Sequence, residues 1–245
     1  LCPEATRSFP GQPGLILRAA DGAPILPKFC LHEVRQEPGA LTLIYADTLV
    51  DLTYTAQFSL NPDTQIVATL GSKEGFANLA QAITAPGDVI YAPDPSYPLH
   101  AYGFIIAGAE IQAIPAITAD EYLAGVKAAL ASAEKLPLAI VVCFPSNPTG
   151  HVAYISFYEE IVAIAKQHNI IILSDLAYSE IYFTTPPPSI FQVEGAKEVA
   201  VETISLSKTY SMAGWRMGFA VGSKSLIAAL ARVKSYLDYG AFTPI

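Results

Sequence analysis

From residue 62 onward, short apolar runs alternate with longer stretches in which apolar and polar residues recur at helical spacing. The apolar runs predict strands at residues 64–70, 88–92, 110–116, 138–144, 170–175, 200–207 and 216–222. The amphipathic stretches predict helices at residues 72–84, 98–109, 120–135, 155–169 and 223–240. This alternation indicates an α/β fold, in which a mostly parallel, mixed sheet lies between two layers of helices.

Residues 1–60 follow a different pattern. The segments "PGQPG", "DGAPILP" and "QEPGA" are rich in turn-forming residues, and "ALTLIYADTLVDLTYTAQF" has no clear period. We therefore set residues 1–60 apart as an N-terminal segment and expect one large domain at residues 61–245.

Composition narrows the class of protein. The 245 residues are 52% hydrophobic and 15% charged, which is ample for a buried core. The net charge is −8 and no basic cluster occurs, so a nucleic-acid partner is not expected. No apolar run reaches the length of about 20 residues that crosses a bilayer, and the start does not resemble a signal peptide. Three cysteines at no paired spacing indicate a reduced, cytoplasmic setting, and four scattered histidines predict no metal site.

Three loops that follow buried strands carry candidate binding groups. In "GSKEG" (71–75), Ser72 and Lys73 open a helix whose free N–H groups favour a phosphate, although a plain helix cap is the alternative. In "FPSNPTG" (144–150), the amide of Asn147 could reach a ligand oxygen, or the segment is only a connecting loop. Asp175 ends a buried strand, where a carboxylate is costly without a cationic partner, and Tyr178 follows within one helical turn.

A fourth loop, "SLSKTYSMAGWR" (205–216), places Lys208 among small hydroxyl residues, with no other charge before Arg216. Such an amine is a candidate nucleophile toward an aldehyde, and Arg216 could bind a phosphate in bidentate fashion. For this stretch alone, an exposed loop lysine is an equal alternative. Together the four loops offer a phosphate site, an amide for a ligand oxygen, a carboxylate for a pyridinium nitrogen and an amine for a Schiff base. These are the requirements of pyridoxal 5′-phosphate (PLP).

The order of these motifs resembles that of the fold-type I, class I/II aminotransferases, especially the branch of alanine-type and LL-diaminopimelate-type enzymes. The resemblance runs from about residue 61 to the end and rests on "GSKEG", "PDPSYP", "FPSNPTG", "SDLAYSEI" and "SLSKTYSMAGWRMGF". It implies an aminotransferase-like, PLP-binding large domain and a homodimer. It also implies catalytic roles: Lys208 would form the Schiff base with PLP and then carry the proton, and Asp175 would keep the pyridine nitrogen protonated. Tyr178 and Asn147 would bond the phenolic oxygen of the ring.

The same resemblance implies a binding site for the rest of the cofactor. Tyr97 in "PSYP" would stack on the ring face, although a core tyrosine in a proline-bounded turn is the alternative. The phosphate would be bound by Ser72, Lys73 (through its backbone N–H), Ser205 and Arg216.

Two departures from the family pattern shape the expectation. Family members continue into a small C-terminal domain whose arginine binds the substrate α-carboxylate, whereas this sequence stops at "AFTPI". After Arg216 the remaining arginine is Arg232, in an amphipathic stretch. Residues 1–60 do not match the N-terminal arm of the family. We therefore expect a large domain that lacks the C-terminal small domain. Such a chain would hold PLP but transaminate poorly.

The leading hypothesis is a transaminase that moves an amino group between a small L-α-amino acid, of the alanine, glutamate or aspartate type, and a 2-oxo acid. A PLP-dependent C–S lyase or other α,β-elimination enzyme is an alternative, and it would turn over without a 2-oxo acid acceptor. A non-catalytic PLP-binding regulator is a second alternative. It would need a basic helix-turn-helix, and residues 1–60 hold four basic residues and no such helices.

Overall fold

The computed structural model describes residues 60–240 in full and, before them, only the backbone of five strands. These are β1 (Leu17–Arg18), β2 (Pro24–Ile25), β3 (Leu31–Glu37), β4 (Ala40–Tyr45) and β5 (Thr48–Leu52). β1 pairs with β2, and β3, β4 and β5 form a three-stranded antiparallel sheet. By its internal contacts the chain divides into two compact units, Leu1–Ser59 with Phe242–Ile245, and Leu60–Ala241. The expected divergence of residues 1–60 falls mostly outside the described residues and stays a prediction.

The second unit is built on a seven-stranded sheet in the order β6-β12-β11-β10-β9-β7-β8. β12 is antiparallel to both of its neighbours, and the other strands all run in one direction. This arrangement confirms the mostly parallel, mixed sheet that the sequence predicts. The strands are β6 (Ile66–Thr69), β7 (Val89–Asp94), β8 (Glu110–Pro115), β9 (Ala139–Val142), β10 (Ile171–Asp175), β11 (Ala200–Ser205) and β12 (Gly218–Gly222).

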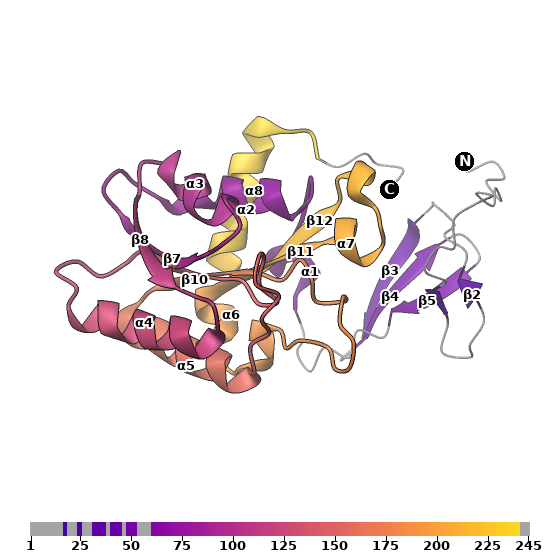
Figure 1. Cartoon of the computed structure of the whole chain (residues 1–245). Coiled ribbons are helices and arrows are strands. Elements are labelled where there is room, and N and C mark those ends of the chain that lie inside the picture. The colour runs from indigo at the N-terminus through magenta and orange to yellow at the C-terminus, as the bar shows by residue number, and fades with distance from the viewer. Residues whose placement is uncertain are drawn as a thin grey trace. The chain divides into compact units, whose positions relative to one another are not determined.

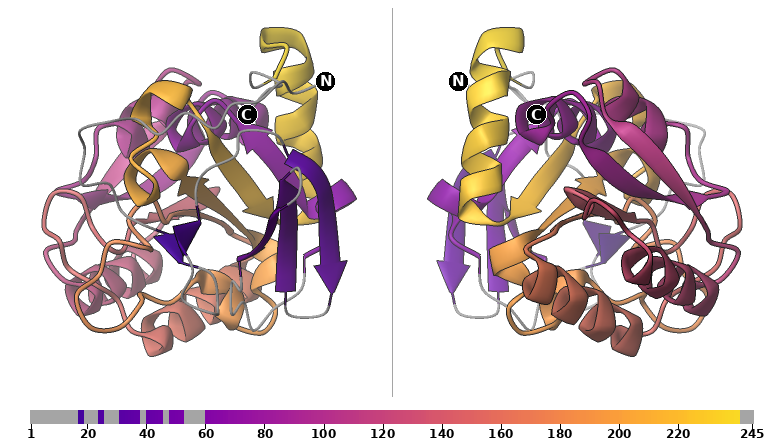
Figure 2. Two further views of the ribbon diagram at one scale, coloured as in Figure 1. Left: turned by 90° about the vertical axis from the view of Figure 1, so that its right-hand side faces the viewer. Right: turned by 90° about the vertical axis from the view of Figure 1, so that its left-hand side faces the viewer.

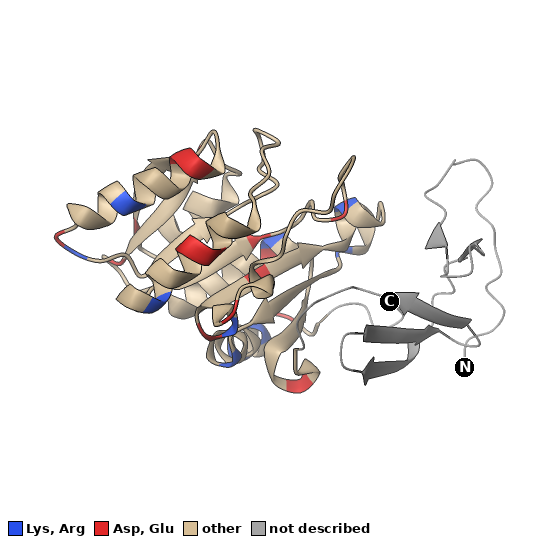
Figure 3. Ribbon diagram, turned by 90° about the horizontal axis from the view of Figure 1, so that it is seen from below, with Lys and Arg blue, Asp and Glu red and all other residues tan. Residues whose placement is uncertain are grey.

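Helices cover both faces of this sheet, as Figures 1 and 2 show from three sides. One layer holds α2 (Ser72–Ile83), α3 (Leu99–Ile105) and α8 (Lys224–Leu237). The other holds α4 (Ala119–Ala131), α5 (Ile155–His168) and the short α6 (Ala196–Val199). Acidic and basic residues are interspersed on the helices of this unit (Figure 3). Within the described ranges, no helix combines the length and the apolar character that a bilayer crossing requires.

The core explains why the central strands are apolar throughout. All four residues of β9 are buried, because helices pack on both sides of the sheet. On the α2 side the core cluster consists of Phe76, Leu79, Ala80, Ile90, Phe104, Ala139, Val141, Leu173, Val201, Ala220, Ile227 and Leu230. On the other side, aromatic rings of Tyr122, Phe144, Phe157 and Tyr158 pack edge to face under α4 and α5.

Short helices are where the structure departs from the predicted elements. Residues 64 and 65, predicted as strand, end the helix α1 (Pro62–Gln65), which the Asn61 side chain caps. Residues 206 and 207 belong to α7 (Leu206–Thr209) rather than to a strand. Two 3₁₀ helices, η1 (Ile190–Gln192) and η2 (Ala213–Trp215), also lie in segments for which no element was predicted. α7 and η2 supply part of the cavity described next.

Candidate active site

A cavity of about 280 Å³ lies at the carboxyl ends of the parallel strands, where ligands bind in sheets of this kind. All nine residues that the sequence singles out line it, although they come from segments up to 144 positions apart, between Ser72 and Arg216. Five further residues complete the lining: Leu99, Cys143, Ala177, Ser207 and Ala213.

One end of the cavity combines a helix N-terminus with an arginine side chain, two groups that favour an anion. α2 begins at Ser72, after Gly71 with φ +83°, so its free N–H groups and the positive end of its dipole face this end. A side chain at Gly71 would collide with the guanidinium of Arg216. Arg216 is held in place because Nη1 donates to the Ala213 carbonyl (2.9 Å) and Nη2 to the Leu70 carbonyl (3.3 Å). The Ser205 hydroxyl, which accepts from the Ser207 N–H (3.2 Å), lies on the same cavity wall.

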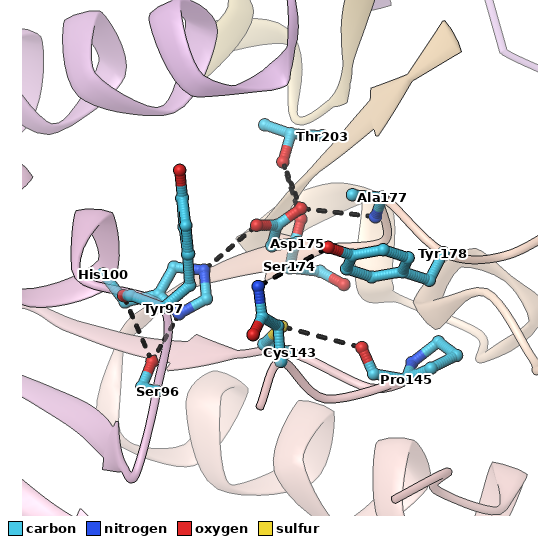
Figure 4. A network of polar contacts seen from close by, with 11 residues as sticks. Ser96, Tyr97, His100, Cys143, Pro145, Ser174, Asp175, Ala177, Tyr178 and Thr203 are labelled. Atoms are coloured by element: carbon cyan, nitrogen blue, oxygen red, sulfur yellow. Dashed lines mark hydrogen bonds and ion pairs between the residues drawn. The ribbon is translucent and has the colours of Figure 1, made fainter. Parts of the chain in front are cut away.

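Asp175 supplies a buried carboxylate at the end of β10. It is only 8% exposed, and its Oδ2 lies 3.0 Å from Nε2 of His100 (Figure 4). Its Oδ1 accepts from the Ala177 N–H (3.3 Å) and the Thr203 hydroxyl (3.5 Å). The other ring nitrogen of His100 bonds the Ser96 hydroxyl. This chain of contacts fixes the carboxylate and leaves it at the cavity wall.

His100 is a site residue that the sequence analysis missed. It is fully buried on α3, and its contact with Asp175 joins residues 75 positions apart. Sequence spacing can indicate only partners that are close along the chain, and Asp175 is not one of them. Two aromatic rings pack beside His100. Phe76 is distant in sequence, and a tyrosine three residues away, Tyr97, is not unusual, so no local signal marks His100.

Tyr178 and Asn147 meet on the wall beside Asp175. The Asn147 amide donates to the Tyr178 hydroxyl (3.5 Å). Burial and the negative charge of Asp175 raise the pKa of Tyr178, although the bond from Asn147 opposes the shift. The Tyr178 hydroxyl therefore keeps its proton at neutral pH and can donate a hydrogen bond to an oxygen of a ligand. The Lys208 Nζ lies 6.0 Å from the centre of the Tyr178 ring, so amine and phenol share one region of the cavity.

Two amines line the cavity, and they occupy different surroundings. The Lys73 Nζ lies 5.0 Å from the centre of the Tyr97 ring, a cation–π distance. Lys208 is carried by the single turn of α7, directly after β11. The resemblance expects Lys73 to contribute its backbone N–H to a phosphate site, and the structure places that N–H at the second position of α2.

Cys143 is a buried residue of the cavity lining, and its thiol is not activated. Its sulfur, a ring nitrogen of His100 and a carboxylate oxygen of Asp175 all lie within 4.8 Å of one another. Burial, with a smaller effect of the charge on Asp175, raises the pKa of Cys143 to about 12. The thiol therefore stays protonated, and it donates weakly to the Pro145 carbonyl at 3.7 Å.

Comparison with known proteins identifies the family of the chain. A family profile described as "Aminotransferase class I and II" matches residues 45–239, and so begins inside the segment that the sequence analysis sets apart. AatC of Rhizobium meliloti (strain 1021) is 60% identical over 187 residues, which is 76% of this chain and 46% of that protein. Glutamate-pyruvate aminotransferase AlaC of Escherichia coli (strain K12) is 45% identical over 187 residues, 76% of this chain and 45% of AlaC. Substrate-bound BacF from Bacillus subtilis superposes with a TM-score of 0.70 at 36% identity, covering 76% of this chain and 47% of BacF. The chain therefore spans about half the length of the relatives it matches.

Proposed function

Because this chain belongs to the class I and II aminotransferases, we propose that its cavity binds PLP and serves transamination between a small L-α-amino acid and a 2-oxo acid. One observation carries the proposal: a single cavity holds an amine, a buried carboxylate and an anion-binding helix N-terminus. The name of AlaC, a glutamate-pyruvate aminotransferase, supports alanine or glutamate as the donor.

The residues present fit this cofactor. Gly71 leaves room for the guanidinium of Arg216, so a phosphate can be bound by Arg216, by the Ser205 hydroxyl and by the N–H groups at Ser72 and Lys73. A buried carboxylate needs a cationic partner, and a protonated pyridine nitrogen would give one to Asp175.

The bound cofactor would supply an electron sink for a carbanion at the substrate Cα. The protein groups would do the rest. Asp175, braced by His100, would hold the ring nitrogen in its charged form. Tyr178 would donate a hydrogen bond to the phenolic oxygen, with Asn147 orienting its hydroxyl. The Lys208 amine would hold the cofactor covalently, and, once released by substrate, would take the Cα proton as a general base.

The test compares the two cavity amines. Wild type, Lys208→Ala and Lys73→Ala are titrated with PLP, reduced with borohydride and digested for mass spectrometry. We expect a visible absorbance band and a modified peptide containing Lys208 in wild type and in Lys73→Ala. In Lys208→Ala the modified peptide should be absent, and the absorbance should be that of free PLP rather than of the lysine-linked cofactor. A modified peptide that contains Lys73 rather than Lys208 in wild type, or modification of the cavity that disappears only in Lys73→Ala, would overturn the assignment of the reactive amine.

Acceptor dependence separates transamination from elimination. We expect sustained amino-donor consumption to require an added 2-oxo acid, whereas pyruvate release beyond one equivalent per bound PLP without an acceptor would favour the lyase instead.

A further inference from the structure

Glu74 lies beside the anion-binding end of the cavity without lining it. It is the third residue of α2, and its Oε2 accepts from the backbone N–H of Leu70, one residue before the N-cap (2.8 Å). The Asn78 side-chain amide, one turn further along the helix, donates to Oε1. An acidic residue that reaches back from this position fixes the entry of the chain into the helix, as in a capping box.

Lys234 on α8 clamps this carboxylate from the neighbouring helix. Its Nζ lies 3.0 Å from Oε1 and 3.1 Å from Oε2 of Glu74, and 2.8 Å from Oδ2 of Asp238. The Lys234 side chain is only 8% exposed, and a lysine so buried needs this pairing. The hydrogen bond from Lys234 is the main reason why the pKa of Asp238 is lowered.

The backbone of Leu70 connects this cluster to the cavity. Its N–H is bonded to Glu74, and its carbonyl accepts from Nη2 of Arg216. The next residue, Gly71, begins the turn that presents the first N–H groups of α2. A shift of Glu74 would therefore move the backbone of Leu70, which precedes the helix N-terminus and accepts from the guanidinium.

We propose that Glu74, clamped by Lys234, is a positioning residue for phosphate binding, and that it makes the cavity prefer PLP over pyridoxal, which lacks the phosphate. This inference rests on the proposed function. Helix α8 would then support phosphate binding, although no residue of α8 lines the cavity.

The main test compares Glu74→Ala with Glu74→Gln. The dissociation constants of PLP and pyridoxal are measured by absorbance titration, and the readout is their ratio. Glu74→Ala leaves Lys234 paired with Asp238 but leaves the Leu70 N–H without its acceptor. We expect the preference for PLP to fall about tenfold. Glu74→Gln keeps an acceptor oxygen, so we expect a change of less than about threefold.

The sign of the effect separates positioning from simple charge. Removing a negative charge near an anion site would by itself strengthen phosphate binding. A loss of preference in Glu74→Ala can therefore not come from long-range electrostatics. Urea unfolding of each variant is measured in parallel, because a purely structural role would lower stability and leave the ratio unchanged.

Lys234 provides a second, independent comparison. Lys234→Met leaves two unpaired carboxylates beside α2, and we expect it to lower the preference for PLP by about tenfold or more. The double variant Glu74→Gln/Lys234→Met removes the ion pair without stranding the Glu74 carboxylate and should recover most of the preference. Lys127→Met is the matched control, because it breaks an exposed ion pair with Glu160 on α4 and α5.

The outcomes are distinct from failure of the proposed function. A wild-type chain that binds neither PLP nor pyridoxal would overturn both proposals. A wild-type chain that prefers PLP, with Glu74→Ala and Lys234→Met keeping that preference, would overturn this inference alone. If Glu74→Ala does not fold, Lys234→Met/Asp238→Asn decides, because it removes the clamp on Glu74 without changing the net charge. Loss of the preference in this variant supports positioning, and an unchanged preference overturns it.

Discussion

Glu202 shows how one buried residue can set a pH dependence for the whole chain. It lies on β11, is 1% exposed, and accepts hydrogen bonds from Ser189 (2.7 Å), Ser174 (3.0 Å) and the Ile190 N–H (3.2 Å). Burial raises its pKa from the usual 4.5 to about 7. The folded state therefore holds this proton more tightly than the unfolded state. The stabilising contribution is complete below pH 4.5 and is lost as the pH rises to about 7.

We expect this loss to be on the order of 3 kcal/mol, from the difference between the two pKa values. Glu202→Gln keeps a neutral side chain of the same shape at every pH. Urea unfolding followed across this range should show wild type losing stability relative to the variant as the pH rises. Parallel curves for the two proteins would mean that Glu202 is not protonated in the folded state.

At the residue scale, the sequence identifies what is local and misses what is tertiary. Lys208, Asp175 and Asn147 could be predicted because each follows a buried strand, and parallel strands bring their carboxyl ends to one edge of the sheet. His100 and Glu202 could not, because their partners lie on other elements. His100 meets Asp175 across 75 positions, and Glu202 meets Ser174 across 28.

At the element scale, long periodic segments were predictable and single-turn elements were not. The helices α4 and α5 lie within two residues of their predicted starts, since a long amphipathic pattern carries a strong signal. The turn α7 begins where the Ser205 side chain caps the Ser207 N–H, and this local bond ends the strand earlier than the apolar pattern indicates. Such short elements form through caps and tertiary contacts rather than through periodicity.

The junction of β12 with α2 gives a prediction at this scale. Gly218 pairs with Thr69 on one side and Ser205 on the other, and an added Cβ would lie 2.7 Å from both the Ile204 carbonyl oxygen and the Ser72 nitrogen. These are backbone atoms, so Gly218→Ala must displace the start of α2. We expect it to destabilise the fold by about 1–3 kcal/mol and to weaken PLP binding.

Gly214→Ala is the control for this substitution, because a Cβ there meets no atom within 4 Å. Urea unfolding and PLP titration of both variants form the measurement. Equal behaviour of the two variants would show that β12 does not constrain the helix start.

At the scale of the whole molecule, the cavity joins segments from Ser72 to Arg216, so a ligand that contacts all of them should stabilise the fold as a unit. At a PLP concentration about 100 times its Kd, binding to the native state alone adds about 2.7 kcal/mol. For a chain of this size that corresponds to a rise in Tm of about 5–10 °C. Thermal unfolding with and without PLP measures this rise in Tm, and Lys208→Ala should show a smaller rise.

PLP can also react with surface lysines, but these remain available in the unfolded chain, so such reaction leaves Tm nearly unchanged. Absorbance changes in wild type without a rise in Tm would therefore locate the bound PLP outside the cavity and contradict the proposed site.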